Sequence, residues 1–485
     1  MWTSVNRWLT WLHRWVGVTL CLLFCMWFAT GAVLHFVGFP ELTAQQRHAL
    51  SEPIDLATLK YGPTVVQPYL RGPAADVSLI SVAGKPVYIV SDTGLPPVAV
   101  DAASGQRLAD FSARTAQTVA ERFARARAMG VVGPFLYDQW IVHQRFDPFR
   151  PFYRVRLSDA ARTDIYVSAR TGEALQRTTR QERVLNWVGA VLHWIYFTPL
   201  RQRWWAWNEL VWWLSAVALL TSAVGTWLGF VRLIAGRAAG RSGLSPFRGW
   251  MKWHHVIGLF AGIVVLVWIF SGWLSMDHGR LFSTGAIDPA ESERMYGMAQ
   301  SDVISAASLT DVRSMTRATE IEFRAIDGRP FLVAWRSNGG TRIQWLDGLH
   351  SNAVSAPLAE AQLLHALCRA WPNSIVRPSA ADGTDELYRR AESIGADALG
   401  VDVLSAHTLR VYVDRQDGRL LVVMDPSRRA YAWVYYALHT LKFPALLNLP
   451  AVRTVLVVIL MVFGLAFSTT GVVLAFNRLK RQLSA

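Results

Sequence analysis

Four histidines occupy places in this 485-residue chain where an imidazole could bind a metal. His13 and His254 each lie near the start of a long apolar segment, whereas His193 and His439 each follow a leucine shortly before another such segment. A strongly polar side chain inside or beside hydrocarbon needs a partner, so these residues are candidates for function. Two imidazoles that face each other from different helices could be the axial ligands of a b-type haem, with an apolar slot for the macrocycle.

The segments around His193 and His439 match each other. A constant shift of 246 residues (439 minus 193) superimposes WVGAVLHWIYF at 187–197 on WVYYALHTLKF at 433–443, and also superimposes Gly225 on Gly471. This ungapped match predicts that the chain is internally duplicated. We therefore expect His193 and His439 to lie at one depth in the folded protein.

A second shift of 241 residues (254 minus 13) superimposes His13 on His254 and Gly31 on Gly272. His13 and His254 should therefore lie together at another depth, which predicts two haem b groups, one near each membrane face.

Three other histidines fit the repeat less well. His35 and His278 lie at the outer ends of two apolar segments, but they are 243 residues apart (278 minus 35) and miss the local register by two. We keep them as ligand candidates of second rank. His255 is not expected to be an essential ligand, because the register places it opposite Arg14.

Four apolar runs must position these histidines. The chain is 52% apolar and contains 22 tryptophans. Each run reaches the length of about 20 residues that a helix needs to cross a hydrocarbon layer of about 30 Å. We place four transmembrane helices at 1–39, 204–233, 250–277 and 451–477, with interfacial segments at 183–203 and 429–450 that carry His193 and His439.

The distribution of charge predicts the topology. The loop at 234–249 and the tail at 478–485 are basic, and every acidic residue except Glu209 lies in the two long stretches 41–182 and 277–425. By the positive-inside rule, both termini and the short loop are cytoplasmic. The net charge of +14 is then mainly a consequence of topology, so we expect contact with membrane lipid and no binding of nucleic acid.

The two outward-facing domains are predicted at 40–182 and 278–428. Alternating strands turn at Gly172 and Gly418, and amphipathic helices are expected at 113–128 and 358–370. Each domain should be a small α+β unit of about 140 residues with a core of its own. The predicted fold class is an α-helical membrane protein with α+β extracytoplasmic domains, in which the order helix, domain, helix occurs twice.

The strand–turn–strand segments at 166–175 and 412–421 resemble the PepSY module. The first and third helices also open with a His-x-x-x-Gly motif, at His13 and at His254. With these features the whole chain resembles the PepSY-associated transmembrane family, which includes iron-regulated inner-membrane proteins and ferric-siderophore reductases. The resemblance implies a bacterial inner-membrane protein with periplasmic domains. It also implies that haem b passes electrons from an unidentified donor to the iron of a ferric siderophore.

Other chemistries have less support. No Walker A loop, convincing dinucleotide fingerprint or zinc-ligand spacing is present. Cys21 and Cys25 are interpreted as small apolar residues of the first span, and Cys368 stands alone. The basic and aromatic segment 140–153 could bind an anionic chelate or pack its aromatic rings on its own domain.

Two alternative functions have to be compared with electron transfer. The first is a non-enzymatic membrane module whose PepSY domains bind or regulate a periplasmic partner, with structural histidines. The second is a permease, which is disfavoured because the four spans contain no acidic site and no broken helix.

Overall fold

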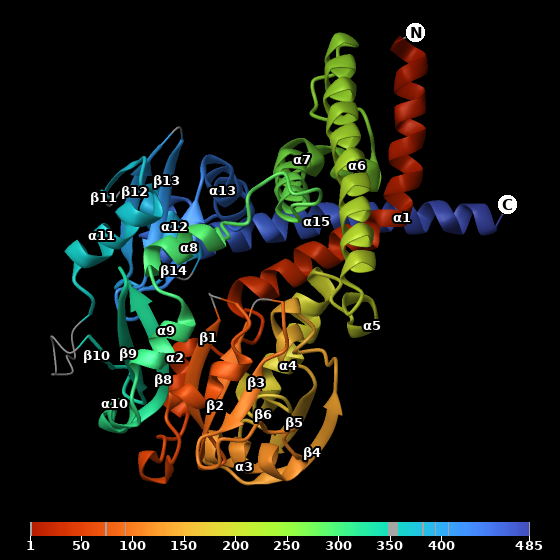
Figure 1. Cartoon of the computed structure of the whole chain (residues 1–485). Coiled ribbons are helices and arrows are strands. Elements are labelled where there is room, and N and C mark those ends of the chain that lie inside the picture. Colours follow the sequence, from red (N-terminus) through yellow and green to blue (C-terminus); the bar gives the residue numbers. More distant parts are fainter. Residues whose placement is uncertain are drawn as a thin grey trace.

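The structure of the protein, a computed structural model, describes residues 2–72, 75–92, 94–347, 357–380, 383–392, 394–405 and 407–484. Its four longest helices are each long and apolar enough to cross a membrane, as the sequence predicted. Helix α1 packs along α15, α6 packs along α7, and α7 also contacts α15. Both chain ends lie on this helical part, away from the sheets (Figure 1). The four helices are α1 (Trp2–Phe36), α6 (Trp204–Ala238), α7 (Gly249–Ser275) and α15 (Pro450–Leu483).

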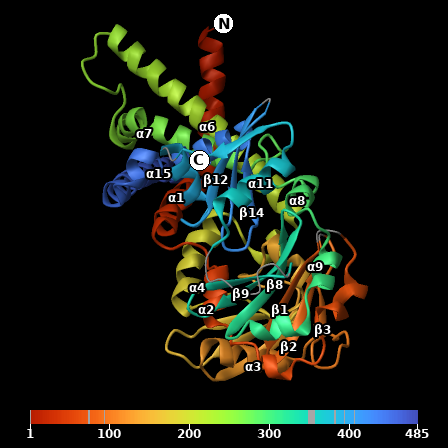
Figure 2. The same cartoon turned by 60° about the vertical axis from the view of Figure 1, so that its left-hand side comes forward.

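Strands from both halves of the chain form one six-stranded antiparallel sheet. Its order is β10-β9-β8-β1-β2-β3, and the halves meet where β1 pairs with β8, with Leu79 opposite Ile321. The two cartoon views agree in placing β1 beside β8 (Figures 1 and 2). The strands are β1 (Asp76–Val82), β2 (Lys85–Ser91), β3 (Val98–Asp101), β8 (Ala318–Ile326), β9 (Arg329–Arg336) and β10 (Thr341–Trp345).

Each half also has a four-stranded sheet of its own, and a helix lies between it and the shared sheet. The orders are β4-β5-β6-β7 and β11-β12-β13-β14. Helix α3 packs between the sheets in the first half, and α11 does so in the second. The elements are β4 (Ala128–Phe135), β5 (Phe152–Leu157), β6 (Asp164–Ser168), β7 (Ala174–Thr178), β11 (Ile375–Pro378), β12 (Leu399–Leu404), β13 (Thr408–Val413), β14 (Leu420–Met424), α3 (Ala113–Ala124) and α11 (Glu360–Ala370).

Short helices connect these sheets to each other and to the long helices. The 3₁₀ turns are η1 (Leu56–Thr58), η2 (Pro63–Tyr69) and η3 (Gln144–Phe149). The α-helices are α2 (Ala44–Leu50), α4 (Arg180–Asn186), α5 (Thr198–Arg201), α8 (Pro289–Tyr296), α9 (Gln300–Ala306), α10 (Leu309–Ser314), α12 (Gly383–Ala391), α13 (Pro426–Ala432) and α14 (Pro444–Leu447).

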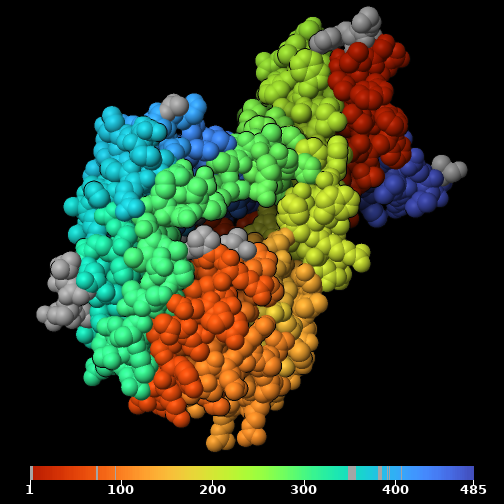
Figure 3. All heavy atoms as spheres, in the orientation of Figure 1, coloured from red at the N-terminus to blue at the C-terminus, as the bar shows by residue number. Residues whose placement is uncertain are grey.

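Each half has a buried core of its own, as predicted, but a further core that the sequence did not predict is shared between the halves. Leu79 and Tyr88 of the first half are packed in one buried cluster with Ile321, Phe323 and Leu332 of the second half. The space-filling view shows the two halves in continuous contact along this boundary (Figure 3). The outer part is therefore a single body, because the β1–β8 pairing extends one sheet across both halves. The order of elements is the same in the two halves, while their origin by duplication stays a prediction.

Candidate functional site

His13 of α1 and His254 of α7 lie side by side among the long helices. Their ring centroids are 6.4 Å apart, and the ring planes are inclined at 38°. The two residues are 241 positions apart in the sequence (254 minus 13). The structure thus brings together the first pair of histidines that the repeat singled out.

Each of these two rings is fixed through Nδ1 by a further helix. His13 Nδ1 lies 3.1 Å from the carbonyl oxygen of Thr221 in α6, and His254 Nδ1 lies 2.9 Å from Thr470 Oγ1 in α15. Neither Nε2 atom has a hydrogen-bond partner in the part of the chain that the structure describes. A metal-binding histidine commonly uses one ring nitrogen for such an anchor and the other for the metal.

His193 lies two residues after one wide π-helical turn, and His439 is the last residue of another; the two turns precede α6 and α15. These turns, η4 (Trp187–Val191) and η5 (Trp433–His439), fall within the repeated segments, and such turns are frequent at functional sites. His193 Nδ1 lies 3.0 Å from Thr30 Oγ1, and His439 Nδ1 lies 3.2 Å from Ser271 Oγ. Thr30 and Ser271 are matching positions of α1 and α7, so His193 and His439 occupy equivalent places in the two halves, and we refer to them as the outer pair.

The hydroxyl anchors were missed by our sequence reasoning. Thr30 and Ser271 directly precede Gly31 and Gly272, so the 241-residue shift superimposes them as well. A small hydroxyl residue at the same place in each half was the signal that could have found them.

Glycines make room for the imidazole rings. A Cβ added at Gly225 would overlap His13, and one at Gly272 would lie 2.9 Å from His439 Cε1. At Gly31 the added atom would be 3.3 Å from Cε1 of His193, whereas at Gly471 it would be 3.8 Å from the His254 ring, an ordinary contact. The repeated glycines thus serve as close-packing surfaces for the histidines.

The histidines of second rank are bound elsewhere. His35 Nε2 lies 3.2 Å from Thr454 Oγ1 in α15. His278 uses both ring nitrogens, with Nδ1 2.9 Å from Asn208 Nδ2 and Nε2 3.5 Å from Glu209 Oε1. His255 lies 2.9 Å from the carbonyl oxygen of Gly229. The structure does not bring His35 or His278 into either histidine pair.

The basic and aromatic segment of the first outer domain packs inward. Trp140, Phe146 and Phe152 belong to a buried cluster, and Arg145 forms a 2.5 Å ion pair with Glu41. This arrangement favours domain packing over a surface for an anionic chelate. Cys21, Cys25 and Cys368 are free thiols.

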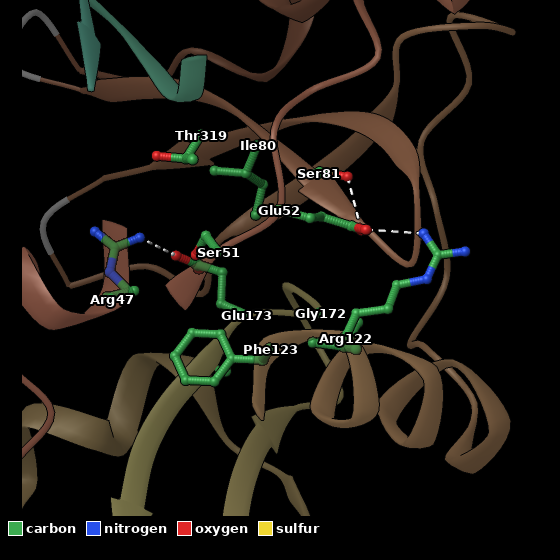
Figure 4. A pocket seen from close by; sticks show the side chains of 12 residues that line it. Arg47, Ser51, Glu52, Ile80, Ser81, Arg122, Phe123, Gly172, Glu173 and Thr319 are labelled. Atoms are coloured by element: carbon green, nitrogen blue, oxygen red, sulfur yellow. Dashed lines mark hydrogen bonds and ion pairs between the residues drawn. The ribbon is translucent and has the colours of Figure 1, made fainter. Parts of the chain in front are cut away.

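A small cavity in the outer body is lined by paired charges (Figure 4). Arg47 bridges the two halves, because its Nη1 lies 3.3 Å from Glu173 and 2.9 Å from Glu320. Burial alone would raise the pKa of Glu320, but the charge of Arg47 and a hydrogen bond from His48 lower this pKa to about 2. Burial raises the pKa of Glu173. With a volume of about 40 Å³ the cavity is far smaller than a ligand site of about 300 Å³ or more.

We refer to His13 and His254 as the inner pair, and their chemistry fits the haem that the resemblance implies. The rings of His13 and His254 lie 6.4 Å apart between centroids, and each has an anchored Nδ1 and an Nε2 without a hydrogen-bond partner among the described residues. These two residues would therefore supply the two nitrogen ligands of a b-type haem, which would provide one-electron redox chemistry. No group of three or more potential metal ligands occurs among the described residues, but a haem requires only two.

Comparison with known proteins identifies the family. A search of the curated proteins found no match. The family model described as the PepSY-associated TM region matches residues 10–367, a span that includes His13, His193 and His254 and ends before His439. Because this match covers well over half of the 485 residues, the chain belongs to the family of the PepSY-associated TM region.

Proposed function

We propose that the protein is an inner-membrane b-haem electron-transfer protein that reduces the iron of a ferric siderophore at the periplasmic side during iron uptake. The observation that carries the proposal is the approach of His13 and His254, whose ring centroids are 6.4 Å apart with Nδ1 anchored and Nε2 free of hydrogen bonds among the described residues. A bound haem would supply one-electron redox chemistry.

The protein's own contribution is to hold and orient the imidazoles. The Nδ1 contacts with Thr221, Thr470, Thr30 and Ser271 fix each ring against a different helix from its own. Such contacts set the orientation of a ligand ring and raise its affinity for a metal. The surrounding apolar helices would keep water away from the cofactor and so influence its potential.

The two histidine pairs are separated along the helices by about the thickness of a membrane. On α1, Gly31 contacts His193 and lies 18 residues after His13 (31 minus 13), which corresponds to about 27 Å of helix. The hydrocarbon layer is about 30 Å thick. With this spacing the spans would place one pair near each face, which supports the proposed path for electrons from a cytoplasmic donor toward the periplasm.

The proposed substrate needs only an electron. Reduction of Fe(III) to Fe(II) lowers the charge of the metal and weakens its hold in a chelate of hard oxygen donors. No acid, base or nucleophile is required for this step. The proposal therefore agrees with a chain in which chemistry-bearing residues in the spans are mainly histidines.

Absorption spectroscopy of the purified full-length protein tests the proposal. We expect reduced-minus-oxidised bands of a six-coordinate b haem that diminish in His13→Ala and in His254→Ala. The control is His255→Gln, because His255 has Arg14 rather than a histidine as its counterpart in the repeat and should not be a ligand. The reduced protein should be reoxidised by a ferric siderophore under anaerobic conditions.

A protein that stays colourless when haem is supplied would refute the proposal and favour the partner-binding module. Haem bands that persist unchanged without His13 and without His254 would show that the iron is held elsewhere. Bands that are present but do not respond to any ferric siderophore would refute the substrate alone.

A further inference from the structure

Arg201, the last residue of α5, is a buried cation without a carboxylate partner. Its exposed fraction is only 2%, and no Asp or Glu of the described residues forms an ion pair with it. Nη2 donates a hydrogen bond of 2.6 Å to Gln144 Oε1. Nε and Nη1 are buried and donate to no described residue. A buried charge without an opposite charge is unfavourable, which suggests that an anion belongs here.

Two aromatic rings cover the faces of this guanidinium. Its central carbon lies 4.8 Å from the ring centroid of Tyr196 and 4.6 Å from that of Trp207. These contacts stabilise the charge but leave the N–H groups at the edge of the guanidinium plane unused. The free donors of Arg201 are thus held in a fixed orientation, as in a binding site for an anionic oxygen group.

The position of Arg201 associates it with the outer histidine pair. Trp207, which covers one face of Arg201, donates a hydrogen bond of 2.8 Å to the carbonyl oxygen of Trp194, the residue after His193. Thr221, which anchors the ring of His13, lies 17 residues after the first residue of α6 (221 minus 204), about 26 Å along that helix.

We propose that Nε and Nη1 of Arg201 bind a carboxylate inside the protein, and, resting on the proposed function, that this carboxylate is a propionate of the haem held by His193 and His439. A lipid headgroup outside the protein does not reach a side chain that is 2% exposed. A propionate belongs to a ligand that is itself embedded between the helices, so it can lie beside a buried arginine.

A binding cycle with haem and its dimethyl ester tests this pairing. Two full-length proteins are compared, one with His13→Ala alone and one with His13→Ala and Arg201→Gln. In both, His13→Ala leaves only the outer pair to bind haem. We expect Arg201→Gln to weaken haem binding about tenfold or more, since hydrogen bonds between charged groups are the strong ones. When Arg201 is present, haem dimethyl ester should bind more weakly than haem by a similar factor. In Arg201→Gln, haem and its dimethyl ester should bind equally well. Exposed Arg203 supplies the control, because Arg203→Gln should behave like the parent.

Equal losses on esterification with and without Arg201 would overturn the pairing, as would an Arg201→Gln protein that binds haem as tightly as its parent. If Arg201→Gln does not fold, Arg201→Met provides an apolar replacement of similar length.

A second measurement separates this inference from the proposed function. If no haem binds, thermal unfolding of the wild-type protein is compared in sodium acetate and in sodium chloride of equal ionic strength. If acetate stabilises the wild-type protein saturably and this stabilisation is lost in Arg201→Met, the carboxylate-binding site at Arg201 is supported although the haem proposal fails. If acetate changes the thermal unfolding of both proteins equally, the carboxylate-binding site at Arg201 is refuted as well.

Discussion

Replacement of Gly272 by alanine should disturb the outer histidine pair specifically. The added Cβ would lie 2.9 Å from His439 Cε1, whereas ordinary contacts begin at 3.4 Å, so the ring must retreat by about 0.5 Å. His439 Nδ1 lies 3.2 Å from both Ser271 Oγ and the Trp268 carbonyl oxygen, and a retreat of this size would break these contacts. Overpacking of this kind costs about 1–3 kcal/mol. Loss of the hydrogen bonds that orient a metal ligand lowers metal affinity about 10- to 100-fold.

The assay is the haem content per chain together with the reduced-minus-oxidised spectrum of Gly272→Ala. We expect loss of the outer haem with the inner haem retained. Gly471→Ala is the matched control, because its Cβ would lie 3.8 Å from the His254 ring and needs no movement. Full haem content with an unchanged spectrum in Gly272→Ala would refute the steric reasoning. A loss of the same size in Gly471→Ala would show that a methyl group anywhere in these helices is enough.

Two further predictions concern the buried charges of the outer body. Arg47→Met should destabilise the outer body by about 3–5 kcal/mol in thermal or chemical unfolding, because it removes the cation shared by the buried carboxylates of Glu173 and Glu320. Arg122→Met, which removes a more exposed ion pair, should cost less than about 1 kcal/mol, and equal losses would contradict the bridging role of Arg47. Because the pKa of Glu320 is lowered from 4.5 to about 2, its contribution is present above pH 4.5 and is lost as the pH falls toward 2. Glu320→Gln should therefore reduce the loss of unfolding free energy between pH 4.5 and 2, and an unchanged slope would contradict the assignment.

Much of the outer fold was predictable where local chemistry decides it. In strand β5 (Phe152–Leu157), buried residues alternate with less buried ones from Tyr153 onward, a pattern that the alternation of apolar and polar residues in the sequence indicates. Gly172 and Gly418 adopt φ angles of +73° and +74°, which suit the turns expected there. Apolar length likewise predicted the four spans. Each of these features depends on residues that are close together in the sequence.

Strand β8 was missed because its charges are neutralised by distant residues. All nine of its residues are buried, including Glu320, Glu322 and Arg324. Charged residues are seldom buried unless they are paired, so this segment did not resemble a central strand. Its partners include Arg47, more than 270 residues earlier in the chain (320 minus 47), and Arg419. The local sequence does not indicate such long-range ion pairs. For the same reason, the sheet that joins the two outer domains was not predicted.

The sequence by itself determined which histidines recur and that they lie in or beside apolar segments. Only the tertiary structure decided that His13 lies beside His254, and that His35 and His278 are engaged by Thr454 and by polar residues of α6. The physical reason is that a helix that is apolar on all sides has no face marked by its sequence pattern. The rotation of each helix, and therefore the partner of each imidazole, is set by close packing between helices, in which glycines and small hydroxyl residues at the contacts decide the fit.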